Sequence, residues 1–130
     1  GLGDRFLRHV ERTKLMLHLV DVSSLEGRDP VEDYRIINRE LANYNKDMAD
    51  RPQIVLATKI DALDDPERLE SLRSVAKQDG KEFLAISSVA NTGLKELVSI
   101  VAKKLDQLKE DEAEKAAEEA RAATSGTISE

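Results

Sequence analysis

The sequence contains no cysteine and no long apolar run. Without cysteine it has no disulfide framework and no thiolate metal site, which fits a reducing cytoplasm without proving it. The apolar run from Leu15 to Val20 is interrupted by His18 and is far too short to span a bilayer, so we expect no membrane segment. No signal peptide is visible, and the start lacks a methionine, so we expect a piece of a longer chain.

Basic residues are outnumbered. The 130 residues include 20 Lys and Arg against 26 Asp and Glu, which gives a formal net charge of −6 and allows one small domain at most. This balance argues against binding nucleic acid by bulk electrostatics. A local basic run could contact RNA, but acidic Asp4 and Glu11 interleave with it, and a solvated helix face is the default reading. The run consists of Arg5, Arg8, Arg12 and Lys14.

Strand-like and helix-like segments alternate along the chain. Asp29-Pro30 and Asp65-Pro66 each place a capping residue before a proline at the first helical position. The alternation predicts right-handed βαβ crossovers and an α/β fold with a parallel three-stranded sheet flanked by helices. The predicted strands are residues 15–20, buried on both faces, 53–57 and 82–86; the predicted helices cover 6–13, 30–48, 66–79 and 94–108.

The composition changes after Leu108. Residues 109–123 are almost entirely Glu, Lys, Asp, Arg and Ala, which favour a helix but offer no apolar face to bury. We therefore expect a domain over residues 1–108 and a charged tail over 109–130, a frayed helix that becomes disordered from Thr124 onward. A coiled-coil helix is the alternative, although Leu-type seam positions are missing.

Two of the predicted strands end in polar loops. The strand Ile54 to Ala57 is followed by Thr58-Lys59-Ile60-Asp61, and the strand Phe83 to Ile86 is followed by Ser87-Ser88. In an open α/β sheet, ligands bind beyond the carboxyl ends of parallel strands. Both loops should therefore face one ligand.

The side chains of these loops suit a guanine base. Asp61 can accept two N–H donors at once, as guanine offers from N1 and its 2-amino group, and the stem of Lys59 can lie across a purine face. The backbone of Ser88 and Val89 can reach the purine carbonyl oxygen, while the Ser87 hydroxyl braces the Asp61 loop. Thr58 would tie this loop to a phosphate-binding loop.

Plainer readings exist for each residue. Thr58, Lys59 and Asp61 could form a solvated turn after a strand, and Thr-Lys-x-Asp alone is a weak motif. His9 and His18 have no second histidine or carboxylate at ligand spacing, so packing or surface roles are favoured over catalysis. Asp21 ends a strand at the ligand edge but has no visible partner, and we assign it no role.

The phosphate half of a nucleotide site is missing from this sequence. A phosphate cradle of the form G-x-x-x-x-G-K-[ST] holds the phosphates through loop N–H groups, a lysine and a magnesium-bound hydroxyl. No lysine here precedes Ser or Thr, and no D-x-x-G is present. We therefore expect no catalytic or metal-binding residues in this chain, and we expect it to be inactive alone.

Residues 1–13, which include Gly1-Leu2-Gly3 and Phe6-Leu7-Arg8-His9, together with three later stretches resemble the Obg (CgtA) GTPases. The resemblance starts just after the family's D-x-P-G switch region and runs to about Leu108, and generic small GTPases do not carry the G-L-G-x-x-F-L-R-H stretch. The family's N-K-x-D motif falls on 58–61, with Thr58 in place of Asn, and its S-A loop on 87–89, with Ser88 in place of Ala. The matching stretches are 1–13, 17–23, 26–34 and 51–55.

The resemblance implies a partial Ras-like P-loop GTPase domain that binds GTP or GDP. It further implies a parent protein that hydrolyses GTP with Mg²⁺ held by ligands outside this chain, and that acts in assembly of the large ribosomal subunit. In the implied sheet order, the strand at 15–20 pairs with a strand upstream of Gly1. Its open edge would then favour self-association of the fragment.

Two hypotheses from different classes stay open. Either the chain reads guanine as part of such a GTPase, or it is a nucleotide-independent interaction module on a Rossmann-like scaffold. A phosphate-binding loop upstream of Gly1 in a longer reading frame would distinguish them, and calorimetry of the chain against GDP, guanosine and ADP is the most useful experiment.

Overall fold

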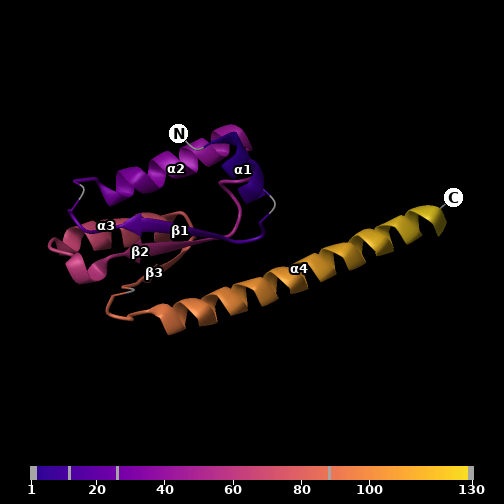
Figure 1. The fold of residues 1–130 in the computed structure, drawn as a ribbon. Coiled ribbons are helices and arrows are strands. Elements are labelled where there is room, and N and C mark those ends of the chain that lie inside the picture. Colours follow the sequence, from indigo (N-terminus) through magenta and orange to yellow (C-terminus); the bar gives the residue numbers. More distant parts are fainter. Residues whose placement is uncertain (1–2, 12, 26, 88, 129–130) are drawn as a thin grey trace. The chain divides into compact units, whose positions relative to one another are not determined.

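The computed structural model describes residues 3–11, 13–25, 27–87 and 89–128 (Figure 1). It divides into two compact units, Gly1–Leu97 and Val98–Glu130, and each is described by itself. The elements in chain order are α1 (Asp4–Glu11), β1 (Met16–Asp21), α2 (Pro30–Tyr44), β2 (Gln53–Thr58), the short 3₁₀ helix η1 (Ile60–Ala62), α3 (Pro66–Gln78), β3 (Glu82–Ala85) and α4 (Leu94–Ile128).

The three strands form one parallel sheet in the order β1-β2-β3. This confirms the α/β fold class. The central strand β2 is buried from Gln53 to Ala57. Its register pairs Thr58 with Asp21 of β1 and Ala57 with Ala85 of β3, so all three strands end at the same level of the sheet.

Local sequence signals start and stop the helices as predicted. The Asp29 carboxylate accepts a 3.0 Å hydrogen bond from the Val31 N–H, and Asp65 does the same for Glu67 at 3.0 Å. Gly80, with φ of +71°, follows α3 in the left-handed conformation that ends many helices. Helix α2, however, ends at Tyr44 instead of continuing to Met48. The Met48 N–H then bonds the carbonyl of Asn45 in a turn.

Two clusters of side chains form the core. In the larger cluster, Tyr34 and Leu72 pack from α2 and α3 against the sheet face that carries Val20, Val55 and Ala57. In the smaller cluster, Leu7 of α1 packs against Leu41 of α2 and against Met48. All of this packing lies on the face of the sheet that is lined by the even-numbered residues of β1.

The prediction that β1 is buried on both faces is wrong. His18 and Val20 are buried, but Leu17 and Leu19 on the opposite face are 41% and 61% exposed. Helix α2 covers only the first face, and β1 stands at the edge of the sheet. Among the described residues, β1 pairs only with β2, so its outer edge is open. Self-association through that edge stays a prediction.

The charged tail lies within one long helix. Helix α4 runs without a break from Leu94 to Ile128. The division into a domain over 1–108 and a charged tail over 109–130 stays a prediction. Alanine, glutamate, lysine and arginine all favour helix, and no proline interrupts the segment. Residues 129–130 lie outside the described part. Within the described residues, no helix has the length and apolarity needed to cross a membrane.

Stability should fall in mild acid because of His18. Its ring stacks on Tyr34 with centroids 5.3 Å apart, and its Nδ1 lies 3.4 Å from Gln53 Oε1. Burial lowers the pKa of His18 below its ordinary 6.5, although the Gln53 contact opposes the shift. Below pH 6.5 the unfolded chain therefore binds the proton more readily, and the free energy of unfolding decreases as pH falls.

The His18→Phe variant, which keeps a ring against Tyr34, should lose this part of the pH dependence. Urea unfolding from pH 7.5 to 5 measures it. An unchanged slope below pH 6.5 in the variant would show that another group is responsible.

Candidate functional site

The loops after all three strands lie at one edge of the sheet. Asp21 ends β1, Thr58 ends β2 and Ala85 ends β3, and the register places these ends side by side. The Val22 N–H also donates to the Thr58 carbonyl at 3.2 Å, and the Ile86 N–H to Ala57 at 2.8 Å. Polar groups from three separate parts of the sequence therefore meet beyond the carboxyl ends of the strands.

The loop after β2 turns sharply at Lys59. Lys59 has φ of +61° and ψ of +38°, the left-handed conformation, and it caps the short helix η1 that contains Asp61. For a residue other than glycine, this left-handed conformation costs about 1–2 kcal/mol of backbone strain. Residues with such strain cluster at functional sites. The turn leaves Lys59 and Asp61 exposed at the edge of the sheet.

The carboxylate of Asp61 is braced from the loop after β3. The Ser87 hydroxyl donates a 2.7 Å hydrogen bond to Asp61 Oδ1, as the brace predicted for it requires. The same hydroxyl oxygen accepts the Ala90 N–H at 3.1 Å, and Ser87 is only 1% exposed. Ser87 therefore connects the two loops from a fixed position.

A backbone bridge and a glycine close the loop after β3. Ser87 and Thr92 exchange backbone hydrogen bonds at 3.1 and 2.9 Å. Gly93 follows with φ of +79°, and a Cβ there would lie 2.6 Å from the Ala85 carbonyl oxygen and 3.1 Å from Ile86 Cγ2. The glycine thus lets the chain pass directly against the end of β3.

Asp21 has partners that the sequence did not reveal. Its Oδ1 accepts hydrogen bonds from the Ser23 N–H at 2.8 Å and from the Ser23 hydroxyl at 2.7 Å, while its Oδ2 lies 3.1 Å from Lys59 Nζ. Burial acts to raise the pKa of Asp21, but the Ser23 hydrogen bonds and the Lys59 ammonium outweigh it and lower the pKa below the ordinary value. Asp21 is therefore charged at neutral pH.

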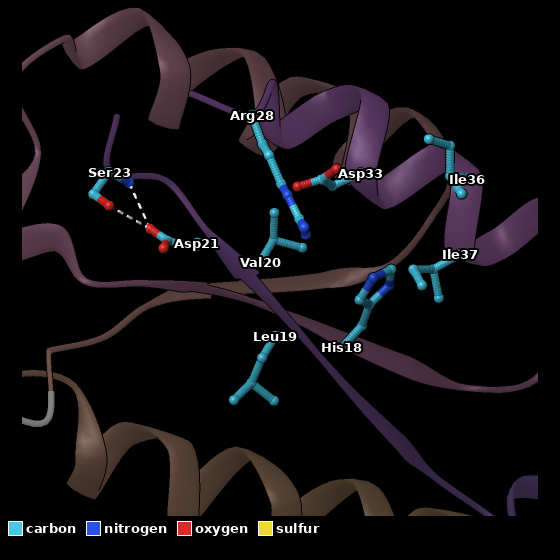
Figure 2. A pocket seen from close by; sticks show the side chains of 9 residues that line it. All are labelled: His18, Leu19, Val20, Asp21, Ser23, Arg28, Asp33, Ile36 and Ile37. Carbon is cyan, nitrogen blue, oxygen red and sulfur yellow. Dashed lines mark hydrogen bonds between the residues drawn. The ribbon is translucent and has the colours of Figure 1, made fainter. Parts of the chain in front are cut away.

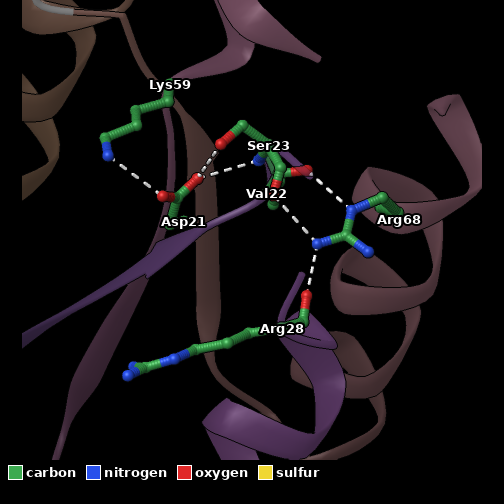
Figure 3. A network of polar contacts seen from close by, with 6 residues as sticks. All are labelled: Asp21, Val22, Ser23, Arg28, Lys59 and Arg68. Carbon is green, nitrogen blue, oxygen red and sulfur yellow. Dashed lines mark hydrogen bonds and ion pairs between the residues drawn. The ribbon is translucent and has the colours of Figure 1, made fainter. Parts of the chain in front are cut away.

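An arginine from α3 holds the loop that follows Asp21 (Figure 3). Arg68 donates to the carbonyl oxygens of Val22 at 3.0 Å and Ser23 at 2.9 Å, and it also contacts the Arg28 carbonyl oxygen. Nothing in the sequence marks Arg68, because its partners are backbone atoms about 40 residues away. The loop after β1 is thereby fastened to α3.

A hollow of about 490 Å³ lies between β1 and α2, on the other side of Asp21 (Figure 2). His18 and Val20 point into it from the strand, and Ile36 and Ile37 from the helix. Asp61 and Ser87 do not line it. The hollow is therefore distinct from the paired loops after β2 and β3, although Asp21, which lines the hollow, also contacts Lys59 of the loop after β2.

The predicted site residues are brought together in part. Asp61 and Ser87 are in direct contact, Thr58 ends β2, and Lys59 follows it at the start of the loop. Val89 follows at 86% exposure. Ser88 lies outside the described residues. The base-reading role of these residues stays a prediction.

Comparison with known proteins shows what most of the chain is similar to. No protein-family profile matches it. It is 51% identical over 116 residues to the GTPase Obg of Alkaliphilus oremlandii, an alignment that covers 89% of this chain and 27% of that protein. It is 51% identical over 109 residues to the GTPase Obg of Syntrophotalea carbinolica (84% and 31% covered) and 45% identical over 112 residues to that of Aquifex aeolicus (86% and 33% covered).

Most of the chain is therefore similar to one part of the Obg GTPases. It spans about a quarter to a third of the length of the Obg proteins it matches, which is consistent with part of a G domain. The three-stranded parallel sheet with flanking helices agrees with a partial P-loop GTPase domain.

The tight approach at Gly93 predicts a destabilising substitution. Gly93→Ala should lower the free energy of unfolding by about 2 kcal/mol or more, because the Cβ adds a clash with the Ala85 carbonyl to the strain of the left-handed backbone. Gly80→Ala is the matched control: Gly80 has φ of +71° but nothing within 4 Å of an added Cβ. Urea unfolding compares the two variants. Equal losses would mean that the loop moves aside at no cost.

Proposed function

We propose that this chain carries the guanine-reading part of an Obg-type G domain, with Asp61 as the group that reads the base. The observation that carries the proposal is the exposed Asp61 carboxylate, held by the buried Ser87 hydroxyl at the carboxyl edge of the sheet. Both residues stand where the Obg resemblance puts guanine recognition.

The chemistry of Asp61 suits guanine and not adenine. An ionised carboxylate offers about four acceptor positions, and the Ser87 hydroxyl uses one of them. Guanine presents two adjacent N–H donors, from N1 and the 2-amino group, whereas adenine has an acceptor at N1 and no amino group at position 2. A fixed acceptor pair therefore binds one purine and leaves its own charge unsatisfied against the other.

The remaining residues complete the base pocket in this proposal. The stem of Lys59 lies along the purine face, and the backbone of Ser88 and Val89 approaches the carbonyl oxygen at position 6. Thr58 connects the loop to the phosphate-binding loop of the longer protein through a hydroxyl, where the family pattern has an amide. The exposure of Lys59 and the closed loop from Ser87 to Thr92 support this arrangement.

We further propose that the longer protein hydrolyses GTP with Mg²⁺ and acts in the cytoplasm in assembly of the large ribosomal subunit, as the Obg resemblance implies. Among the described residues, no group of three or more His, Asp or Glu side chains could hold a metal ion. We assign the residues of this chain no step in hydrolysis.

The chain alone should not hydrolyse GTP. Phosphoryl transfer depends on positioning and charge stabilisation by a phosphate-binding loop, its lysine and Mg²⁺. This sequence contains no motif for that loop. Phosphate release from GTP, followed with Mg²⁺ present, should equal that of a heat-inactivated sample. Turnover that copurifies with the chain and exceeds this control would contradict the expectation.

Nucleosides test base reading independently of the phosphates. In two-dimensional NMR titrations, guanosine should shift the amide signals around Asp61 and Ser87, and adenosine should not. Asp61→Asn should weaken guanosine binding by about 1.5–3 kcal/mol, since it replaces charge-assisted acceptor contacts with an amide that matches only one of the two donors. Xanthosine should gain affinity for the variant, because its N1–H and 2-carbonyl suit the amide.

Asp64→Asn is the matched control for this substitution. Asp64 is also an exposed aspartate of the same connection, and it accepts a hydrogen bond from the Ser24 hydroxyl at 2.5 Å. Its variant should bind guanosine as the original chain does. If Asp61→Asn keeps the original preference for guanosine over xanthosine, Asp61 is not the base reader. If guanosine and adenosine act alike on the unaltered chain, the interaction module is the better description.

A further inference from the structure

Asp21 and Lys59 come from different strands and meet at the edge where the base is proposed to bind. The Lys59 ammonium lies 3.1 Å from Asp21 Oδ2 (Figure 3). The Lys59 side chain is still 52% exposed and that of Asp21 26% exposed, so the pair is accessible to a ligand. The contact follows from the sheet register, which pairs Asp21 with Thr58, the residue before Lys59.

The Asp21 carboxylate is held in place by contacts that do not involve Lys59. Both the N–H and the hydroxyl of Ser23 bond to Oδ1, which leaves Oδ2 turned to Lys59. Arg68 fastens the same loop through the carbonyl oxygens of Val22 and Ser23. An ordinary surface ion pair joins two mobile side chains and contributes little. Here one partner is already fixed, so only the lysine loses freedom.

A lysine side chain loses conformational entropy when it is ordered against a purine face. Its stem is long and flexible, and ordering it on binding costs rotamer freedom. The backbone of Lys59 is already fixed in the left-handed conformation, which sets the direction in which the side chain leaves the strand. An anchor at the far end of the side chain orders the stem between two fixed points. Order that is present before binding does not have to be created by the ligand.

We infer that Asp21 is a positioning residue that anchors the Lys59 ammonium and so presents the lysine stem to the purine face. The inference deepens the proposed function and rests on it. Asp21 itself makes no contact with the base in this arrangement. It is the last residue of β1 and acts on the site only through Lys59.

The first experiment tests the anchor without any ligand. The titration of the Asp21 carboxyl group is followed by carbon-13 NMR in the unaltered chain and in Lys59→Met, which keeps an apolar stem and removes the charge. Loss of the ammonium should raise the pKa of Asp21. The pKa of Asp64, which is lowered by the Ser24 hydroxyl, should not change and serves as the internal control. If the pKa of Asp21 were the same in Lys59→Met as in the unaltered chain, the inference would be overturned.

The second experiment tests whether the anchor acts on the base through Lys59. Guanosine affinity is measured by NMR titration for the unaltered chain, Asp21→Asn, Lys59→Met and the double variant. Asp21→Asn keeps an oxygen for Ser23 and should weaken guanosine by about threefold, the size of an exposed charge pair. In the Lys59→Met background the same substitution should have no effect. A general disturbance of the loop would weaken binding equally in both backgrounds, and that result would overturn the inference.

The outcomes separate this inference from the proposed function. If the unaltered chain does not prefer guanosine to adenosine, the proposed function fails and the role of Asp21 at the base fails with it, even where the titration shows the ion pair. If guanosine is preferred but Asp21→Asn acts equally with and without Lys59, only the positioning role fails. Thermal melts of all variants confirm that each compared chain is folded.

Discussion

The arrangement of the site depends on the parallel pairing of β2 with both of its neighbours. Strand β2 is buried from Gln53 to Ala57 and lies between β1 and β3. Because the strands are parallel and end at the same level, three loops that are far apart in sequence emerge at one edge. A shift of one residue in either register would turn a strand's alternating side chains to the wrong face. The hydrophobic core therefore also fixes the position of the polar loops.

Each of the two candidate base-contacting side chains is held by a residue from another strand. Asp61 is braced by the Ser87 hydroxyl from the loop after β3, and Lys59 is paired with Asp21 at the end of β1. Both braces start from residues that are themselves fixed: Ser87 by its bridge to Thr92, and Asp21 by the N–H and hydroxyl of Ser23. The exposed loop after β2 thus gains its order from its two neighbours.

Local signals in the sequence were sufficient to predict the helices and strands and the edge of the sheet where the polar loops meet. Aspartate-proline pairs marked the helix starts, and apolar runs followed by polar loops marked the strands. These signals are local, so they can be recognised without knowledge of the tertiary structure. Asp21 and Arg68 depended on contacts between distant segments. The sequence places Asp21 at a strand end but shows no partner for it, because Lys59 is adjacent to it only through the strand register.

The error at β1 has a physical origin. The apolar composition of Leu15 to Val20 predicted burial on both faces, yet Leu17 and Leu19 are exposed because α2 covers one face only and β1 is an edge strand. Composition reports how apolar a strand is, whereas its burial depends on which elements lie beside it. For the charged segment after Leu108 the lack of an apolar face suggested fraying. Intrinsic propensity, with no proline in the segment, matches the helix over residues 109–123.

The polar network at the sheet edge also explains how one loop can be both exposed and ordered. A loop that binds a flat aromatic base must leave its polar groups accessible, and accessible side chains are ordinarily mobile. Here the contacts that order the loops do not come from the ligand-facing atoms. Ser87 is buried, and Arg68 donates hydrogen bonds to backbone carbonyl oxygens of the loop after β1. Gly93 allows the chain to pass close to the Ala85 carbonyl oxygen, because it has no Cβ that would clash with that oxygen. Order is thus supplied from below the surface, and the edge above it stays open for a ligand.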